Sequence, residues 1–157
     1  MIAIGAPDSG GASERSMSSI REISQILQST PARGWIARRF FHHIAPRHAE
    51  VIAGRLLPDE TFQCFVLLAN SRKKTAEALV CTDQRVLVWN NQFRDDEVIS
   101  LSAIESVEFQ RGFLSSELRL TENTLKGPER HTFYCQTELL TTFTESVREA
   151  MRNLKRS

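Results

Sequence analysis

Three consecutive cationic side chains, Arg72, Lys73 and Lys74, stand in a short polar stretch between two apolar segments. At the tip of a hairpin, such a cluster can bind anionic headgroups, and each basic residue near a membrane contributes about 1 kcal/mol. Cationic residues are also common at solvated hairpin tips that bind nothing. Both interpretations stay open, and the first makes these three side chains the candidate anion or lipid site.

Arg85 closes a polar stretch between two apolar runs, in the segment LVCTDQRVLVW. This pattern predicts a hairpin with its turn at residues 82–85. As a binding residue, Arg85 would place its planar guanidinium beside the 72–74 loop and bind a phosphate. As a structural residue, it would pair with Asp83 or with backbone carbonyls of the turn. The structural interpretation is favoured, because Asp commonly hydrogen-bonds the backbone in such turns.

A second surface is suggested by the segment WIARRFFHHI, residues 35–44, which has the spacing of an amphipathic helix. Such a helix can lie on an anionic membrane surface. It can also pack its apolar face against the rest of the domain or against a second subunit, which is the usual role in small soluble proteins. The candidate residues for this partner or membrane face are Trp35, Ile36, Arg38, Arg39, Phe40 and Phe41.

The histidines of the N-terminal half do not have metal-binding spacing. His42 and His43 are adjacent, so on a helix their side chains point about 100° apart. His48 lies beyond Pro46, and no Cys-x-x-Cys pair occurs in the chain. We therefore expect no metal site and no cofactor.

Catalytic patterns are missing from the sequence as well. No glycine-rich phosphate loop occurs. The three cysteines lie inside apolar, strand-like runs without an acid or base partner, which predicts buried free thiols rather than nucleophiles or disulfides. They are Cys64, Cys81 and Cys135. We expect a protein that is not an enzyme.

Composition limits the partners and the compartment. The net charge of +1, from 20 Lys+Arg and 19 Asp+Glu, argues against bulk electrostatic binding of nucleic acid. No segment resembles a secretory signal or a membrane span. Together with the free thiols, these features predict a soluble cytoplasmic protein whose membrane contact, if any, is peripheral to the inner face.

The chain divides by composition into three parts. Residues 1–16 are rich in Gly, Ser and Ala and predict a disordered tail. Residues 17–57 predict a segment of short amphipathic helices, the last of which spans Ala49 to Leu56. Residues 58–157 predict a β-rich domain that ends in a helix.

Seven strands are expected in this last part, in meander order. Residues 123–130, NTLKGPER, are predicted to be a loop because Gly127 and Pro128 break regular structure. A continuous apolar stripe after Cys135 predicts a C-terminal helix, with Thr137 as its N-cap. The predicted strands are 61–69, 75–81, 85–90, 97–101, 103–112, 113–122 and 131–135.

A meander with one apolar face must cover that face. It can bend into two near-orthogonal sheets, and the final helix can fill the open end. The sequence therefore predicts a mainly β fold with helices: a seven-stranded antiparallel barrel of two sheets, capped by the C-terminal helix and preceded by N-terminal helices.

Several motifs, taken in order, resemble those of the bacterial pleckstrin-homology (PH) domains, particularly the YokE-like group. They are the Leu-Pro-x-Glu of residues 57–60, the Thr-Asp-x-Arg of 82–85, the Ile-x-x-Val of 104–107 and the Gly-Phe-Leu of 112–114. The resemblance implies a PH-like barrel and no catalysis. Some relatives form ring-like homo-oligomers. The basic signature with which eukaryotic PH domains bind phosphoinositides is not reproduced here.

Two functions follow as hypotheses. The first is a non-catalytic PH-like binding module that acts through protein–protein contacts or self-assembly, at an exposed strand edge or beside the C-terminal helix. The second is a peripheral membrane protein that recognises anionic lipid headgroups through the 72–74 loop, with Arg85, or Arg38 and Arg39, in support.

Overall fold

A computed structural model of the chain describes residues 20–26, 49–68, 78–90 and 95–157. The predicted tail, the predicted helix at 35–44 and the basic loop at 72–74 lie outside these residues. The chain divides into two units, Met1–Leu56 and Leu57–Ser157.

In the first unit, residues 20–26 and 49–55 are helical. Both helices lie within segments where the spacing of apolar residues predicts helix. Within the described ranges, no helix combines the length and the apolar character needed to cross a membrane.

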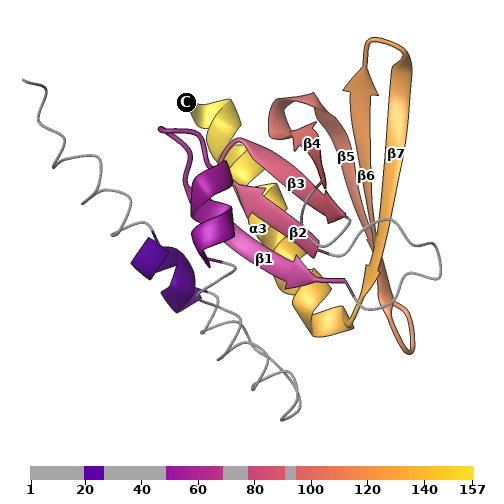
Figure 1. Cartoon of the computed structure of the whole chain (residues 1–157). Helices are drawn as coiled ribbons and strands as arrows, with labels where there is room; N and C mark the ends of the chain where they lie inside the picture. Colours follow the sequence, from indigo (N-terminus) through magenta and orange to yellow (C-terminus); the bar gives the residue numbers. More distant parts are fainter. Residues whose placement is uncertain (1–19, 27–48, 69–77, 91–94) are drawn as a thin grey trace, which may run out of the picture. The chain divides into compact units, whose positions relative to one another are not determined.

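The described part of the second unit contains seven strands and a long final helix (Figure 1). Neighbouring strands are antiparallel, and they form one sheet in the order β1-β2-β3-β4 and another in the order β5-β6-β7. The elements are β1 (Phe62–Leu67), β2 (Ala78–Thr82), β3 (Arg85–Asn90), β4 (Asp95–Ser100), the 3-10 helix η1 (Leu101–Ala103), β5 (Ile104–Gln110), β6 (Ser116–Thr124), β7 (Gly127–Cys135) and α3 (Thr137–Arg156).

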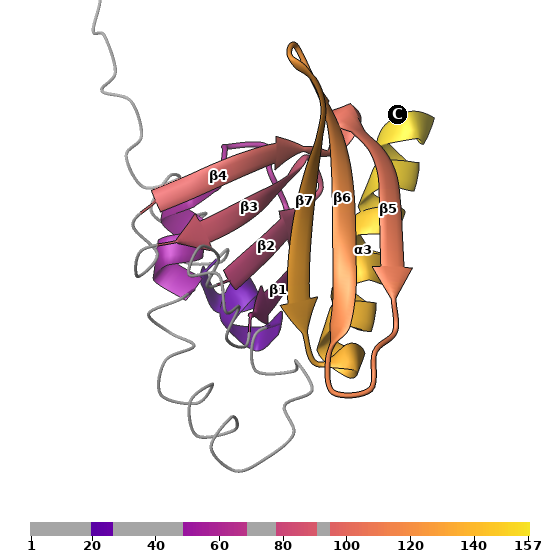
Figure 2. The ribbon, with the colours of Figure 1, turned by 90° about the vertical axis from the view of Figure 1, so that its right-hand side faces the viewer.

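This arrangement confirms the predicted fold class, with one correction: the sheets do not close into a barrel. The chain leaves the first sheet at Ser100, turns through η1 and enters the second sheet at Ile104 (Figure 2). Among the described strands, backbone hydrogen bonds pair β4 only with β3, and β5 only with β6.

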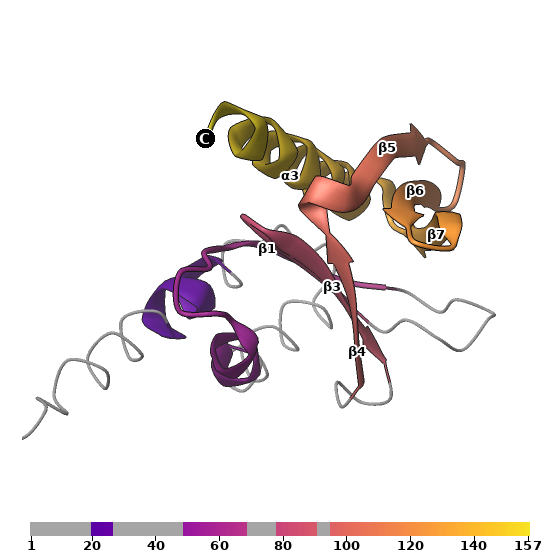
Figure 3. The same ribbon diagram turned by 90° about the horizontal axis from the view of Figure 1, so that it is seen from above.

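The core lies between the two sheets and α3. In the first sheet, alternate residues such as Leu79 and Cys81 of β2 face the core, because successive side chains of a strand point to opposite faces. Leu118 and Leu120 of β6 contribute from the second sheet. The helix α3 contacts strands of both sheets, and it lies on the same side of the first sheet as the second sheet does (Figure 3).

The opposite face of the first sheet is also apolar and buried, which the expectation of a single apolar face did not foresee. Phe65, Val80, Leu87 and Trp89 are each at most 2% exposed and belong to this second set. The rings of Phe65 and Trp89 meet edge to face, with their centroids 6.3 Å apart. Every residue of β2 is therefore buried.

The predicted loop at 123–130 is wrong. The strands β6 and β7 continue through it and leave only Leu125 and Lys126 between them. Gly127 supplies the positive φ of 112° that a short hairpin turn requires. Pro128 is tolerated because β7 is an edge strand of its sheet, where a missing N–H costs no ladder bond.

The predicted N-cap of α3 is also wrong by one residue. Gln136 occupies the cap position and makes no side-chain cap bond, while Thr137 is the first helical residue. The Thr137 hydroxyl instead lies 2.8 Å from the hydroxyl of Ser116, the first residue of β6. This bond joins the start of the helix to the second sheet.

Phe143 is the central side chain by which α3 closes the core, and it is fully buried. Replacing it, Phe143→Ala, should lower the free energy of unfolding by about 3–5 kcal/mol, since a large cavity remains. Urea denaturation measures the change. Glu145→Ala, at an exposed position of the same helix, should change it by less than about 0.5 kcal/mol. Equal effects of the two substitutions would contradict the placement of the core.

Candidate functional site

The candidate binding residue Arg85 forms an ion pair with Glu60, which precedes β1. Its Nε lies 2.7 Å from Glu60 Oε1 and its NH2 nitrogen 2.9 Å from Oε2. The two-pronged geometry is the strong form of an arginine–carboxylate pair. The Glu60 side chain is 0% exposed and that of Arg85 is 18% exposed. The guanidinium is thus engaged in holding two distant segments of the chain together.

Thr82 completes the same group from the end of β2. Its hydroxyl donates to Glu60 Oε1 at 2.6 Å and accepts from the backbone N–H of Gln84 and of Arg85. The second carboxylate oxygen of Glu60 accepts from the backbone N–H of Leu57 at 2.9 Å. A buried carboxylate is therefore satisfied by a guanidinium, a hydroxyl and a peptide N–H.

These contacts determine the ionisation of Glu60. Burial by itself raises the pKa of the carboxyl group, because the charged form loses hydration. The hydrogen bonds from Arg85, Thr82 and the Leu57 N–H, together with the positive charge of Arg85, outweigh burial and hold the pKa below its ordinary value of 4.5.

Asp83 hydrogen-bonds backbone groups, as predicted, but these belong to the distant Thr61, while Arg85 pairs with Glu60. The carboxylate of Asp83 accepts from the backbone N–H of Thr61 at 2.8 Å, and its own N–H donates to the Thr61 carbonyl at 3.0 Å. Beside it, the side chain of Gln84 donates to the carbonyl of Asp59 at 3.3 Å. All the polar residues of the turn therefore contact residues 59–61.

The remaining predicted site residues lie outside the described part of the chain. These are the basic residues Arg72, Lys73 and Lys74 and the partner or membrane face at residues 35–41. The structure brings Arg85 together with Glu60, and the candidate sites at 72–74 and 35–41 stay predictions.

The three cysteines are free and buried, as predicted. Burial raises the pKa of the Cys64 and Cys81 thiols above the ordinary value. The thiolate is the nucleophilic form of cysteine, so these two thiols are poor nucleophiles and contribute to packing.

An exposed apolar tip lies at the turn between β5 and β6. Phe113 is 102% exposed and Leu114 is 86% exposed. The turn is tight, because a Cβ atom on Gly112 would come within 2.0 Å of the Ser115 carbonyl oxygen. The Gly112 N–H points at the hydroxyl of Ser116 at 3.4 Å. Phe113 and Leu114 are thus presented to solvent by a backbone that only glycine permits.

Sequence reasoning missed two groups of polar residues. The first is Glu60 as the partner of Arg85, although the Leu-Pro-x-Glu pattern pointed to that residue. The second is the set around His131, whose side chain lies within 3.3 Å of Glu97 and Glu122. The alternation of Glu129 and His131 places both on one face of a strand, but this signal was lost because Glu129 fell in the segment predicted to be a loop.

Comparisons with known proteins identify the domain. Residues 56–149 match the family model described as bacterial PH domain. Among solved structures, a chain of the crystal structure of human RhoA in complex with the DH/PH fragment of PDZRHOGEF is similar, at 13% identity and a TM-score of 0.44. That match covers 91% of this chain and 41% of the other. No curated protein matches the sequence.

The ion pair of Arg85 should be essential to stability. Arg85→Ala leaves the Glu60 carboxylate buried without its counter-charge, which should cost on the order of 3 kcal/mol of unfolding free energy. Urea denaturation at neutral pH measures the loss. Arg111→Ala, which removes an exposed arginine, serves as the control and should change little. An unchanged midpoint in Arg85→Ala would refute this role.

The low pKa of Glu60 also predicts a pH dependence. The folded pKa lies below the ordinary 4.5, so the carboxylate stabilises the fold above that value and ceases to do so as the pH falls through the folded pKa. Glu60→Gln removes this contribution. The loss of unfolding free energy between pH 6 and pH 3 should therefore be smaller in Glu60→Gln than in the wild type.

A matched substitution at an exposed carboxylate, Glu108→Gln, should leave the wild-type pH dependence intact. Parallel pH profiles for the wild type and Glu60→Gln would show that Glu60 does not titrate in this range.

Proposed function

Since the chain belongs to the bacterial PH domain family, we propose that it is a non-catalytic interaction module that acts through protein–protein contacts, in the first place with a second copy of itself. Its contact point is the apolar tip formed by Phe113 and Leu114. We also assign the chain to the YokE-like group, because the motifs at 57–60 and 112–114 are similar to those of that group. The proposed compartment is the cytoplasm, which suits three free thiols.

The observation that carries this proposal is the high exposure of two large apolar side chains, Phe113 and Leu114, on a tight turn. Burying one such side chain contributes about 1.5–3 kcal/mol. A tight turn that already fixes the backbone of these residues reduces the ordering cost of binding. An aromatic residue that enters a pocket of its partner is the usual centre of a protein interface. Self-association needs nothing more than a complementary surface on a second copy.

The absence of catalysis is part of the proposal. The buried Cys64 and Cys81 thiols have raised pKa values and so carry little thiolate. The guanidinium of Arg85 and the carboxylate of Glu60 neutralise each other within the fold. These groups therefore support the structure rather than a reaction.

Recognition of anionic lipid is the second candidate function. A cationic residue near the same tip favours it. Arg111 is exposed and lies two residues from Phe113. A cationic residue beside exposed Phe and Leu side chains also suits the interface of an anionic membrane. In this version, Arg72, Lys73 and Lys74 supply the headgroup contacts.

Self-association should depend on the tip. We expect the wild type to form oligomers with rising concentration in sedimentation equilibrium. The double variant Phe113→Ser/Leu114→Ser should associate at least tenfold more weakly, since tenfold corresponds to about 1.4 kcal/mol. Leu125→Ser is the matched control, because Leu125 is 109% exposed at the tip of the other hairpin of the second sheet.

A strictly monomeric wild type at several hundred micromolar (roughly the range of weak specific dimers) would refute self-association. Co-sedimentation with anionic vesicles at low salt distinguishes the lipid candidate. Vesicle binding that is lost when Arg72, Lys73 and Lys74 are all replaced by Ser would favour that candidate instead.

A further inference from the structure

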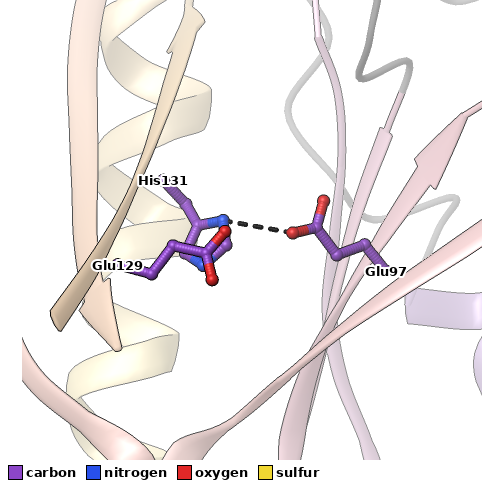
Figure 4. Close-up of side chains that lie close together, drawn as sticks. All are labelled: Glu97, Glu129 and His131. Atoms are coloured by element: carbon purple, nitrogen blue, oxygen red, sulfur yellow. Dashed lines mark ion pairs between the residues drawn. The ribbon is translucent and has the colours of Figure 1, made fainter. Parts of the chain in front are cut away.

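Four ionisable side chains meet where the apolar core ends. Glu97 of β4 lies on the same face of its strand as the core residue Ile99, and His131 of β7 on the same face as the core residue Phe133. Glu129 shares this face of β7. Glu122 of β6 is the direct cross-strand partner of Glu129. The inner faces of both sheets therefore change from apolar to ionisable at this point, and Figure 4 shows three of the ionisable residues, Glu97, Glu129 and His131.

Three of these residues have the composition and spacing of a metal site. One donor atom from each of Glu97, Glu129 and His131 lies within 4.8 Å of the other two. Figure 4 shows the Glu97 carboxylate reaching toward the imidazole from the opposite sheet. The two glutamates are exposed, so their side chains are free to rotate. The imidazole is held more firmly, since the His131 side chain is only 9% exposed.

Both ring nitrogens of His131 face carboxylates. The Nδ1 atom lies 3.3 Å from Glu97 Oε1, and the Nε2 atom lies 3.2 Å from Glu122 Oε2. A neutral imidazole carries one N–H, so it can donate to only one of them. The other nitrogen then turns a lone pair toward a negative oxygen. A cation placed between that nitrogen and the facing carboxylate would satisfy both groups.

The negative charges around His131 also favour a bound cation. Three carboxylates, those of Glu97, Glu122 and Glu129, surround one imidazole. In the part of the chain that the structure describes, Glu97 and Glu122 pair with His131, and none of the three carboxylates pairs with a Lys or Arg. A divalent cation bound among these carboxylates would offset most of their negative charge.

We propose that Glu97, Glu129 and Nδ1 of His131 bind a divalent transition-metal ion of the Zn²⁺ class. Glu122 acts as a positioning residue, since it accepts the Nε2 hydrogen and directs the Nδ1 lone pair to the ion. A carboxylate behind a metal-binding histidine is the usual arrangement in protein metal sites. The imidazole selects a transition ion over Mg²⁺ or Ca²⁺, which prefer all-oxygen ligands.

The ligand atoms need to move only slightly closer to one another to coordinate the ion. Ligand atoms about 2.1 Å from a tetrahedral Zn²⁺ ion lie about 3.4 Å apart, which rotation of the two exposed glutamates reaches from the observed spacing. Three protein ligands leave the fourth position to water. The ion would link β4 to β7, two described strands that no backbone ladder joins. It would therefore hold together two sheets that are otherwise open on this side.

Titration of the full chain with ZnCl₂ after removal of metal by a chelator tests the site. Isothermal titration calorimetry should give a saturable site, with binding at least tenfold weaker in Glu129→Gln and in Glu97→Gln. Glu108→Gln, at an exposed position of β5, should bind as the wild type does. The chain has other histidines, His42, His43 and His48, outside this site. The loss of Zn²⁺ affinity in Glu129→Gln is therefore the result that places the bound ion at Glu97, Glu129 and His131.

Two outcomes overturn the proposal. One is the absence of saturable Zn²⁺ binding to the wild type at neutral pH. The other is equal affinity in the wild type and Glu129→Gln, which would place any bound ion at other residues. Thermal unfolding gives an independent readout: saturating Zn²⁺ should raise the Tm of the wild type but not that of Glu129→Gln, since only a ligand of the folded state stabilises it.

The positioning role of Glu122 has its own test. Glu122→Gln should weaken metal binding about 10–100-fold, as other substitutions behind metal-bound histidines do, and Glu122→Asp should restore part of it. Replacing Zn²⁺ with Co²⁺ adds a spectroscopic signature, whose visible absorption should shift in Glu122→Gln. An unchanged Co²⁺ spectrum and affinity would exclude this role.

Discussion

The pairing of Glu60 with Arg85 is the interaction on which the first sheet depends. It joins the segment before β1 to the turn between β2 and β3, and Thr82 adds a hydroxyl bond to the same carboxylate. Around it, Asp83 holds the backbone of Thr61, and the carbonyl of Gln84 accepts from the N–H of Leu101. The buried carboxylate and the neighbouring residues of the turn together position the start of β1, the hairpin β2–β3 and the entry into η1.

From η1 onward, the chain builds a second sheet, and among the described strands no ladder joins it to the first. Because strands that share no hydrogen bonds are held only by side chains, α3 must contact both sheets to close the core. At the end where the core residues stop, the facing strands carry Glu97, Glu122, Glu129 and His131 instead. Because the sheets are open, side-chain contacts must hold them together. The same arrangement brings polar groups from the two sheets close to each other. The same openness leaves the turn between β5 and β6 free in solvent, with Phe113 and Leu114 at its tip.

Much of this fold could be predicted from local patterns. The alternation in β6 and the apolar stripe of α3 are periodic signals that depend only on neighbouring residues. The errors occurred where tertiary context overrides a local preference. Gly127 and Pro128 were predicted to break the strand. Gly127 instead supplies the positive φ of a hairpin turn, and Pro128 lies on an edge strand. Thr137 is a good cap by type, yet its hydroxyl lies against Ser116, a residue 21 positions earlier in the chain.

The sequence by itself determined that this chain forms a meander followed by an amphipathic helix, that its cysteines are packed inside strands, and that the segment 82–85 is a turn. These properties follow from residue type and period. Only the tertiary structure decided that Arg85 pairs with Glu60, 25 residues away, and that His131 lies between Glu97 of β4 and Glu122 of β6. Such contacts depend on how strands are ordered and on which faces meet, and no spacing along the chain encodes that directly.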